Sequence, residues 1–365
     1  MQLESLTLKN FRNYASEKFN YGAGVNVITG GNAQGKTNSA EAVFLLATGF
    51  SPRVKKDKQV IRYGESEAEI SGQAISAYGS VKTSLTFFAD GKKKISVNEA
   101  EVKRVGDLLG NIYAVFFNPG ELKLIQESPE DRRRFMDIAL SQLNRRYFYS
   151  LSKYKKIIVQ RNNLLKESDK ELILDTLPVW DEQLADYAAD VIEGRNEFCS
   201  KLAPKAKAAH EAVTGGEESL FVGANEKFKG SREEIKEKFK AALAENTERD
   251  MALGFTSVGP HRDDLKIMLN GEDVKSYGSQ GQQRTAALSL KLAELEIFKE
   301  RFGEYPLLIL DDALSELDRS RQKRLLKYVE NVQTIITCTH IEEEVFVGTD
   351  YKKFEVEKGK IVKES

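Results

Sequence analysis

A phosphate-binding loop is encoded near the start of the chain. The segment VNVITGGNAQGKTN places Gly30, Gly35, Lys36 and Thr37 in the spacing G-x-x-x-x-G-K-[ST], between an apolar run and a helical pattern. Backbone N–H groups of such a loop point at an anion, and the helix dipole adds positive potential. Lys36 would reach the β and γ phosphates, and the Thr37 hydroxyl would ligate Mg²⁺. The predicted nucleotide site comprises Gly30, Gly31, Asn32, Ala33, Gln34, Gly35, Lys36, Thr37 and Asn38.

The nucleotide is expected to be ATP, because the chain contains no NKxD-like stretch that would read guanine. Two adjacent carboxylates, Asp311 and Asp312, follow the apolar run LLIL at residues 307–310. In a phosphate-loop ATPase the first acid, Asp311, holds the Mg²⁺ shell, and the second, Asp312, polarises the attacking water as general base. A strand that runs into a helix N-cap would give the same letters without catalysis. The phosphate loop is what favours the catalytic interpretation.

A second anion site is indicated by YGSQGQQRT, residues 277–285, which directly precedes the apolar-periodic stretch ALSLKLAELEIF. Ser279 and the backbone of Gly281 lie where a helix is expected to start, and free N–H groups at such a start attract an anion. Lys36 and Ser279 are 243 positions apart, and the phosphate loop already serves one anion. The second site therefore needs a ligand of its own.

These segments together resemble ABC-type ATPases of the SMC branch, in particular the members that act in bacterial recombination and repair. The resemblance extends over essentially the whole chain, through NFRNY, GGNAQGKTN, FFNPGELKLI to PEDRRRFMD, SVGPHRDD, YGSQGQQRT and LLILDDALSELD. It implies that the ABC signature consists of Ser279, Gln280, Gly281 and Gln282. It also implies a D-loop at Ser315, Glu316, Leu317 and Asp318, and a switch histidine at His340.

The resemblance gives the second anion site its ligand. In this class the signature docks on the γ-phosphate that a second copy of the protein holds. One loop and one signature per chain then imply a two-fold homodimer that encloses two ATP molecules. Hydrolysis would remove the γ-phosphate, weaken the interface and reopen the dimer. We expect a weak, DNA-dependent ATPase whose catalytic residues are Lys36, Asp312 and His340.

Three positions depart from the usual pattern of the class. The signature reads SQGQ where transporters usually have SGGQ, and Asp312 stands where many relatives have glutamate. The shorter base favours slow turnover. Asn118 stands where a Q-loop glutamine is expected after NIYAVFF, so we assign no Mg²⁺ ligand at that position.

Several basic clusters are candidate DNA contacts, because lysine and arginine neutralise phosphates. Each could equally be an ordinary solvated face. The resemblance implies sequence-independent contacts with double-stranded DNA and single-strand/double-strand junctions, and partner proteins of recombinational repair. It also makes Arg12 of NFRNY a candidate nucleotide contact, whereas His261 and Arg262 of SVGPHRDD receive no role. The candidate DNA residues are Arg53, Lys55, Lys56, Arg132, Arg133, Arg145 and Arg146.

The elements that must position these residues read as an α/β fold. Alternating or β-branched runs predict strands at LESLTLKNF, VNVIT, EISGQAIS, VKTSLTFFAD, KKKISVNEAEV, NIYAVFF, DLKIML, PLLILDD and QTIITCT, with helices over 37–48 and 285–300. Turns are expected at Asp90-Gly91 and Asn270-Gly271. We therefore predict an ABC-type ATPase head, which has a mixed sheet with the phosphate loop and an antiparallel β subdomain.

A helical insertion separates the two halves of this head. Apolar residues spaced three or four apart, from Leu140 to Ile158, predict one long helix, and a second stripe from Leu184 to Leu202 predicts its antiparallel partner. Pro178 and Gly215-Gly216 are taken to mark connections. The predicted domains are an ATPase head at 1–118 and 254–365 and a helical lobe, or short coiled-coil arm, at 119–253.

Composition excludes some classes of partner. The formal net charge is −1 with 30% charged residues, so any attraction to DNA must come from local patches. The longest apolar runs are far shorter than a membrane span, and the N-terminus lacks the pattern of an export signal. Cys199 and Cys338 lie 139 positions apart outside any CxxC motif, which favours two buried thiols. We expect a cytoplasmic, nucleoid-associated protein without membrane contact.

Two alternatives remain open at this point. An ATP-hydrolysing transporter subunit would share the loop and the signature, although it would not need the strand-rich lobe and helical arm between them. A structural DNA clamp would bind ATP without useful hydrolysis.

Overall fold

The computed structural model describes residues 1–224 and 227–365. The chain divides into two compact units. The first consists of Met1–Gln126, Pro204–Phe221 and Met268–Ser365, and the second of Glu127–Ala203 and Val222–Ile267. The insertion predicted at 119–253 rests on hydrophobic periodicity rather than on packing, and its bounds remain a prediction.

A six-stranded sheet in the first unit carries the candidate site. Its strand order is β15-β14-β3-β13-β12-β8, all parallel except β15. Because these strands are parallel, the carboxyl ends of β3, β12, β13 and β8 lie at one edge of the sheet. Ligands of such folds bind at this edge. The bounds are β3 Val25–Thr29, β8 Ala114–Phe117, β12 Leu307–Asp311, β13 Thr334–Cys338, β14 Tyr351–Glu357 and β15 Lys360–Glu364.

The second sheet of this unit is antiparallel, in the order β2-β1-β4-β5-β6-β7. Burial alternates along its strands, as in β4, because one face packs on the core and the other meets solvent. The predicted turn at Asp90-Gly91 is confirmed, with Gly91 at φ +87°. The strands are β1 Gln2–Phe11, β2 Tyr14–Asn20, β4 Glu67–Ser76, β5 Gly79–Phe88, β6 Lys93–Val97 and β7 Ala100–Val102.

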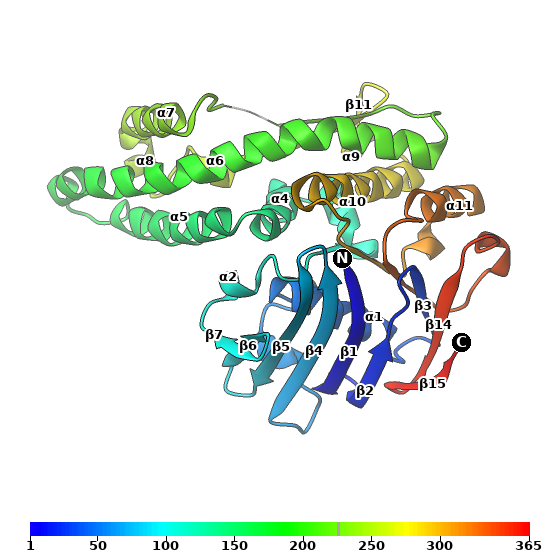
Figure 1. The fold of residues 1–365 in the computed structure, drawn as a ribbon. Helices are drawn as coiled ribbons and strands as arrows, with labels where there is room; N and C mark the ends of the chain where they lie inside the picture. The colour runs from blue at the N-terminus through cyan, green and yellow to red at the C-terminus, as the bar shows by residue number, and fades with distance from the viewer. Residues whose placement is uncertain (225–226) are drawn as a thin grey trace. The chain divides into compact units, whose positions relative to one another are not determined.

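Helix α1, Lys36–Thr48, lies between the two sheets (Figure 1). It contacts β8, β12 and β13 of the parallel sheet and β4 and β5 of the antiparallel sheet. Almost every side chain of α1 is therefore buried, and its sequence carries no amphipathic stripe. The helix ends at Gly49, whose φ of +73° lets its N–H bond to the carbonyl of Leu45.

A third, small sheet contains the hairpin that the sequence predicted at Asn270-Gly271. The hairpin is confirmed, because both residues have positive φ, +51° and +89°. It joins two strands of a small sheet, order β11-β10-β9. The bounds are η1 Asp57–Val60, α2 Val105–Leu108, η2 Pro119–Leu122, α3 Lys123–Gln126, β11 Glu272–Asp273, α9 Val274–Tyr277, α10 Gln280–Phe302, η4 Leu314–Glu316, α11 Arg319–Tyr328 and η5 Glu343–Val345, whereas β9 Leu220–Ala224 and β10 Leu265–Leu269 each belong partly to the second unit.

The second unit is helical, and it corrects two predictions. The apolar stripe from Leu140 to Ile158 is not one helix, because Asn144 breaks it into α4 and α5. Asn144 adopts φ −149° and accepts hydrogen bonds from the N–H groups of Arg146 and Tyr147, which starts a new helix. The helices and short helical turn that lie wholly or partly here are α4 Pro129–Leu143, α5 Arg145–Leu164, α6 Lys170–Thr214, α7 Arg232–Glu245, α8 Thr247–Leu253 and η3 Pro260–Arg262.

Pro178 does not mark a connection, since it lies inside α6, the long green helix of Figure 1. A proline costs a helix interior about 3 kcal/mol. Pro178 itself is exposed, whereas its neighbours Ile173, Leu177 and Leu184 are buried, and this burial outweighs the missing hydrogen bond. The Gly215-Gly216 pair does end α6, as predicted, at φ +81° and +84°.

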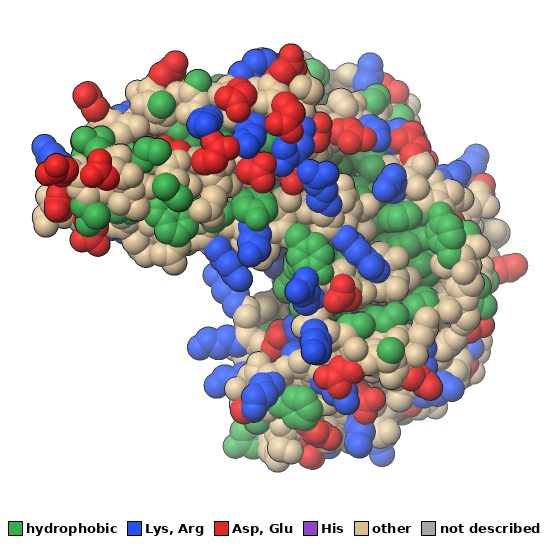
Figure 2. Space-filling view, turned by 60° about the vertical axis from the view of Figure 1, so that its left-hand side comes forward, with side chains coloured by type: hydrophobic (Ala, Val, Ile, Leu, Met, Phe, Trp, Pro, Cys, Tyr) green, Lys and Arg blue, Asp and Glu red, His purple; other side chains and the backbone are tan. Residues whose placement is uncertain are grey.

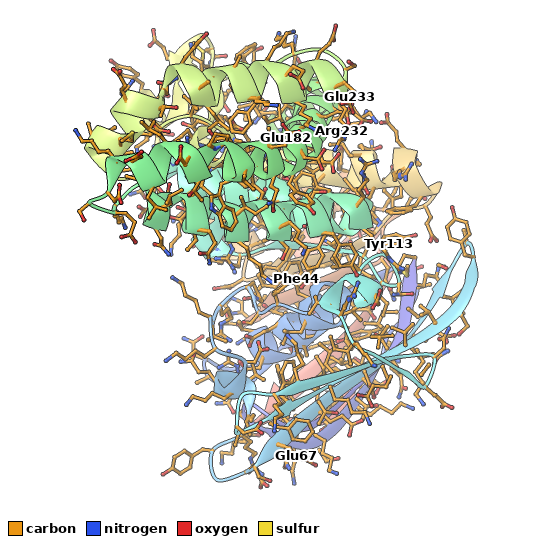
Figure 3. The ribbon with its side chains drawn as sticks, turned by 90° about the vertical axis from the view of Figure 1, so that its left-hand side faces the viewer. Phe44, Glu67, Tyr113, Glu182, Arg232 and Glu233 are labelled. Carbon is orange, nitrogen blue, oxygen red and sulfur yellow. The ribbon has the colours of Figure 1, made fainter. Side chains whose placement is uncertain are left out.

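Ion pairs cover the surface where α6 and α7 meet. Figure 3 labels Glu182 on α6 and Arg232 and Glu233 at the start of α7. Arg232 pairs with Asp186 at 2.9 Å and with Asp190 at 2.7 Å. Figure 2 accordingly shows acidic and basic side chains interspersed over these helices. Among the residues that the structure describes, no helix is both long and apolar enough to cross a membrane.

Candidate nucleotide-binding site

The phosphate loop runs from the end of β3 to the start of α1 and depends on two glycines. Gly30 and Gly35 have φ of +149° and +126°, and a Cβ on Gly30 would lie 2.3 Å from the carbonyl oxygen of Val356. The Lys36 ammonium reaches over the loop and donates to the carbonyls of Gly30 and Gly31 at 2.8 and 2.7 Å. Side chains other than glycine at residues 30 and 35 would displace the backbone from this path.

Two turns hold the phosphate loop from outside. Asn13, in the β1–β2 turn, donates its amide to the carbonyl of Gln34 at 2.7 Å, and Tyr14 donates to the carbonyl of Gly35 at 3.1 Å. In the β14–β15 turn, the N–H of Lys358 donates to Gln34 Oε1 at 2.7 Å. These contacts were not predicted, although Asn13 and Tyr14 lie in the NFRNY segment that carried part of the resemblance.

The predicted metal ligands come together at the carboxyl edge of the parallel sheet. The Thr37 hydroxyl donates to Asp311 Oδ1 at 2.8 Å, and the Thr337 hydroxyl donates to the same oxygen at 2.7 Å. Asp311 is 4% exposed, and burial raises the pKa of its carboxyl although both hydroxyls lower it. A hard cation would offset that burial, so Thr37 and Asp311 fit Mg²⁺. Thr337 was missed because the run QTIITCT reads only as a buried strand.

The proposed base, Asp312, has an unusual backbone. Its φ is +53°, in the left-handed region that non-glycine residues rarely adopt. Its N–H donates to the carbonyl and the hydroxyl of Thr337 at 3.1 and 3.0 Å, which holds this conformation. His340 follows β13 on the same sheet edge, is exposed, and its Nδ1 lies 3.2 Å from the Thr339 hydroxyl. Asn118, at the end of β8, also belongs to this edge.

Arg12 is held beside the nucleotide loop by a buried carboxylate. Glu41 of α1 is 0% exposed, and Arg12 binds it with two nitrogens at 2.9 and 2.7 Å. Arg53 lies 3.4 Å from the same carboxylate and donates to Asn38 Oδ1 at 2.9 Å. A direct contact of Arg12 with nucleotide remains a prediction. The sequence did not single out Glu41, because in a helix that is buried on all sides no pattern separates a functional acid from the other buried residues.

The predicted signature, residues 279–282, lies at the N-terminus of α10 and is solvent-accessible. Ser279 is the N-cap: its hydroxyl accepts from the N–H of Gln282 at 3.3 Å, and Gln282 Oε1 accepts from the N–H of Ser279 at 2.9 Å. Ser279 and Gln280 are exposed, and Gly281 and Gln282 are half-buried. Gln283 was missed; its amide donates to the carbonyls of Val274 and Gly278, both at 3.1 Å, and so fastens the preceding turn.

The predicted D-loop, residues 315–318, is bonded to α10, which carries the predicted signature. Glu316 pairs with Arg284, on the second turn of α10. Asp318 is the N-cap of α11 and accepts from the N–H of Arg321 at 3.0 Å, while the Arg321 guanidinium donates to the Thr285 hydroxyl at 3.0 Å. These polar contacts therefore connect the predicted signature helix with the predicted D-loop.

Some of the candidate DNA residues are bonded to carboxylates or carbonyls of the protein, and others are exposed. Arg132 is 8% exposed and bound by two nitrogens to Asp264 at 2.5 and 3.0 Å, which favours a structural role. Arg133 donates to the carbonyl of Asp263 at 2.7 Å, and Arg146 pairs with Asp190 at 2.9 Å. Lys55, Lys56 and Arg145 are exposed, and DNA binding by any of the seven residues remains a prediction.

His261 is a structural residue within the helical unit. The Tyr154 hydroxyl donates to Nδ1 at 2.6 Å, and the Nε2–H donates to the carbonyl of Thr256 at 2.9 Å. These roles are those of the neutral ring, which burial favours by lowering the pKa of His261 to about 4. The guanidinium of Arg262 lies 5.0 Å from the ring centre of Phe255 and 3.3 Å from the carbonyl of Thr256.

A pH-dependent loss of stability follows from His261. Its pKa of about 4 lies below the usual 6.5, so the unfolded chain binds a proton that the folded chain does not. The stabilisation is complete above pH 6.5 and is lost as the pH falls towards 4, by at most about 3 kcal/mol. Urea unfolding of the His261→Gln variant should therefore depend less on pH in this window than that of the wild type. Equal pH dependence of both proteins would contradict the assignment.

Comparison with known proteins identifies the class of this architecture. Residues 2–360 match the family described as RecF/RecN/SMC N terminal domain. A solved Smc head bound to the C-winged helix domain of ScpA shares the fold, with a TM-score of 0.59 at 16% identity over 98% of this chain and 94% of that chain. The chain thus has the ABC-type ATPase head fold of the SMC class, as predicted.

Closer relatives specify the family within this class. The DNA replication and repair protein RecF of Clostridium acetobutylicum is 41% identical over 362 residues, 99% of each chain. That of Alkaliphilus oremlandii is 43% identical over 367 residues, 99% of this chain and 100% of the relative. A solved structure of the recombination mediator protein RecF-ATP has a TM-score of 0.89 at 36% identity, covering 100% of this chain and 97% of that chain. The chain belongs to the RecF family.

Proposed function

We propose that this chain is an ATP-dependent DNA-binding protein of recombinational repair and replication-fork maintenance, whose ATP-bound homodimer clamps DNA. The curated relatives reported above are named DNA replication and repair protein RecF, and a solved relative is described with ATP in the RecFOR pathway. The observation that carries the proposal is the pair of separate anion sites. Lys36 and the Thr37–Asp311 pair form one, and the exposed start of α10 forms the other.

The chemistry assigned to the site is slow ATP hydrolysis. The loop amides and Lys36 would bind the phosphates, and Thr37 and Asp311 would hold Mg²⁺. The ion would neutralise charge that develops on the phosphate oxygens. Asp312 accepts a proton from the attacking water, and His340 lies on the same sheet edge to contact the γ-phosphate.

Ser279 and the backbone at Gly281 complete the site of a second copy. Their helix has 23 residues, so its dipole is fully developed at the N-terminus. ATP is then enclosed between two chains, and loss of the γ-phosphate lowers the affinity of the copies for each other. In this arrangement ATP is both the substrate and the ligand that holds the two chains together.

The partners follow from the family. We infer binding to double-stranded DNA and to single-strand/double-strand junctions, and cooperation with RecR and RecO in loading a recombinase, because the solved relative belongs to the RecFOR pathway. The corresponding location is the cytoplasm, at the nucleoid.

Two other functions are less well supported. A transporter's ATP-hydrolysing subunit would not be expected to match RecF relatives over 99% of their length. A clamp that binds ATP without hydrolysis would not need the strained backbone at Asp312, whose φ is +53°. Release of phosphate from ATP in the presence of duplex DNA separates the clamp from the ATPase.

Lys55 and Lys56 provide a direct test of DNA binding. Both are exposed in the connection between α1 and η1, which is fastened to α1 by Arg53 and to β6 by an Asp57–Lys93 pair at 2.8 Å. The double variant Lys55→Glu/Lys56→Glu should bind duplex DNA at least about tenfold more weakly with ATP. The slope of log affinity against log salt should fall by roughly 2.

The control replaces charges away from this connection. The control residue is Lys207, which is more exposed than Lys205, a residue that is 19% exposed and pairs with Glu300. The variant Lys207→Glu changes surface charge without touching residues 51–60. Wild-type DNA affinity in the double variant, with an unchanged salt slope, would remove Lys55 and Lys56 from the DNA-binding surface. Absence of ATP-dependent DNA binding by the wild type would contradict the proposed function itself.

A further inference from the structure

Glu218, between α6 and β9, joins three elements of the first unit. Its side chain is 13% exposed, and its Oε1 accepts from the amide of Gln282 at 3.0 Å. Its Oε2 lies 3.2 Å from Nε2 of His210 and 4.0 Å from the guanidinium of Arg321. Gln282 belongs to the signature, His210 to the last turns of α6, and Arg321 to α11 just after the D-loop. One carboxylate therefore lies where all three meet.

The carboxylate determines which way the Gln282 amide faces. Oε1 of Gln282 accepts from the N–H of Ser279 at 2.9 Å, and its Nε2 donates to Glu218 at 3.0 Å. Because a carboxylate only accepts hydrogen bonds, Glu218 opposes the reversed amide, in which Gln282 Oε1 would face the carboxylate, acceptor against acceptor, while Nε2 would face the Ser279 N–H, donor against donor. Glu218 and the Ser279 N–H thus select, from opposite ends of the amide, the orientation that closes the capping box around Ser279.

The other side of Glu218 faces α6. His210 is 0% exposed, and its Nδ1 lies 3.0 Å from the Ser289 hydroxyl on α10. Arg324 of α11 donates to the carbonyl of Thr214, the last residue of α6, at 3.0 Å. The end of α6 is therefore fastened to the signature helix and to the helix after the D-loop. Since α6 is one helix from Lys170 to Thr214, the signature is bonded to the helix that continues into the second unit.

We propose that Glu218 is a positioning residue for the signature. It holds Gln282, and through it Ser279, in the orientation that receives the γ-phosphate of ATP bound by a second copy, and it links this orientation to the end of α6. The proposal rests on the proposed function, because it assumes that the signature acts on a second copy. Glu218 acts through Gln282, so its loss should affect the union of two chains and leave nucleotide binding by one chain intact.

Three variants and a control test the proposal, each measured for ATP affinity and for ATP-dependent dimerisation by sedimentation. Glu218→Ala should retain wild-type ATP affinity. Loss of a hydrogen bond to a charged group should weaken each of the two signature contacts about tenfold, and hence the dimer about a hundredfold. Glu218→Gln can still accept from the Gln282 amide and should restore most of the dimerisation. Glu217→Ala, at the exposed neighbouring residue, should match the wild type.

The outcomes separate this inference from the proposed function. Should the wild type dimerise with ATP and Glu218→Ala dimerise equally well, the inference fails and the proposed function stands. A wild type that stays monomeric with ATP contradicts the proposed function itself. If Glu218→Ala does not fold, Glu218→Asp decides, because its shorter carboxylate cannot keep the contacts with both Gln282 and His210; dimerisation equal to that of the wild type overturns the inference. So does failure of Glu218→Gln to dimerise more strongly than Glu218→Ala.

Discussion

Lys36→Ala is expected to lower the affinity for ATP by at least about a hundredfold and to abolish ATP-dependent dimerisation. The ammonium of Lys36 is 2.8 and 2.7 Å from two carbonyls of the phosphate loop, so a phosphate bound there lies within its reach. Loss of a hydrogen-bonded contact between two charged groups costs roughly 3 kcal/mol, which corresponds to the stated factor. Equilibrium binding of a fluorescent ATP analogue measures the change.

The matched control is Lys18→Ala, which removes the same charge from an exposed position on β2. It should bind ATP like the wild type. Unchanged ATP affinity in Lys36→Ala would show that the nucleotide is not held by this loop, and the assignment of Thr37 and Asp311 to Mg²⁺ would then lose its basis.

Asp312→Asn is expected to separate ATP binding from hydrolysis. The asparagine has the same shape and tolerates the left-handed backbone, φ +53° in the wild type, that the Thr337 contacts stabilise. Its amide cannot accept a proton from water, so hydrolysis should fall by roughly a hundredfold or more while ATP affinity is retained. The ATP-bound dimer should then persist, as phosphate release and sedimentation in the same sample will show.

Asp350→Asn, an exposed change before β14, serves as the control and should hydrolyse ATP at the wild-type rate. If Asp312→Asn altered neither phosphate release nor the lifetime of the dimer, Asp312 would not be the base. The interpretation of the protein as a non-hydrolysing clamp would then gain support.

The sequence predicted those parts of the fold where local pattern and tertiary burial agree. The strands around the phosphate loop are short apolar runs bounded by turn residues, and the loop motif fixes both its glycines and its lysine. Asp311 and Thr37, 274 positions apart, could be brought together only because a parallel sheet places the ends of its strands at one edge.

The predictions that failed depend on competition between local and tertiary effects. Periodicity continues through Asn144, so the helix break there follows from side-chain capping, which a spacing argument does not detect. Pro178 normally ends a helix, yet burial of neighbouring side chains keeps α6 intact.

Three of the unpredicted site residues share one property: the role of each is defined by a partner that is distant in sequence. Glu41, Thr337 and Glu218 act through side chains that are distant in sequence. Glu218 is 64 positions from Gln282, and no local pattern links the two. A motif specifies the groups that touch the ligand, whereas the residues that orient them are visible only after folding.

Sedimentation of the Asp312→Asn protein with saturating ATP and Mg²⁺ tests the central claim most directly, because blocked turnover preserves the closed state. The expected result at micromolar concentration is a dimer with ATP and a monomer with ADP or without nucleotide. A second substitution, Ser279→Arg, should abolish the dimer and leave ATP affinity unchanged, since it places a bulky side chain at the start of α10. A protein that remains monomeric under all these conditions would contradict the claim that two chains enclose each ATP.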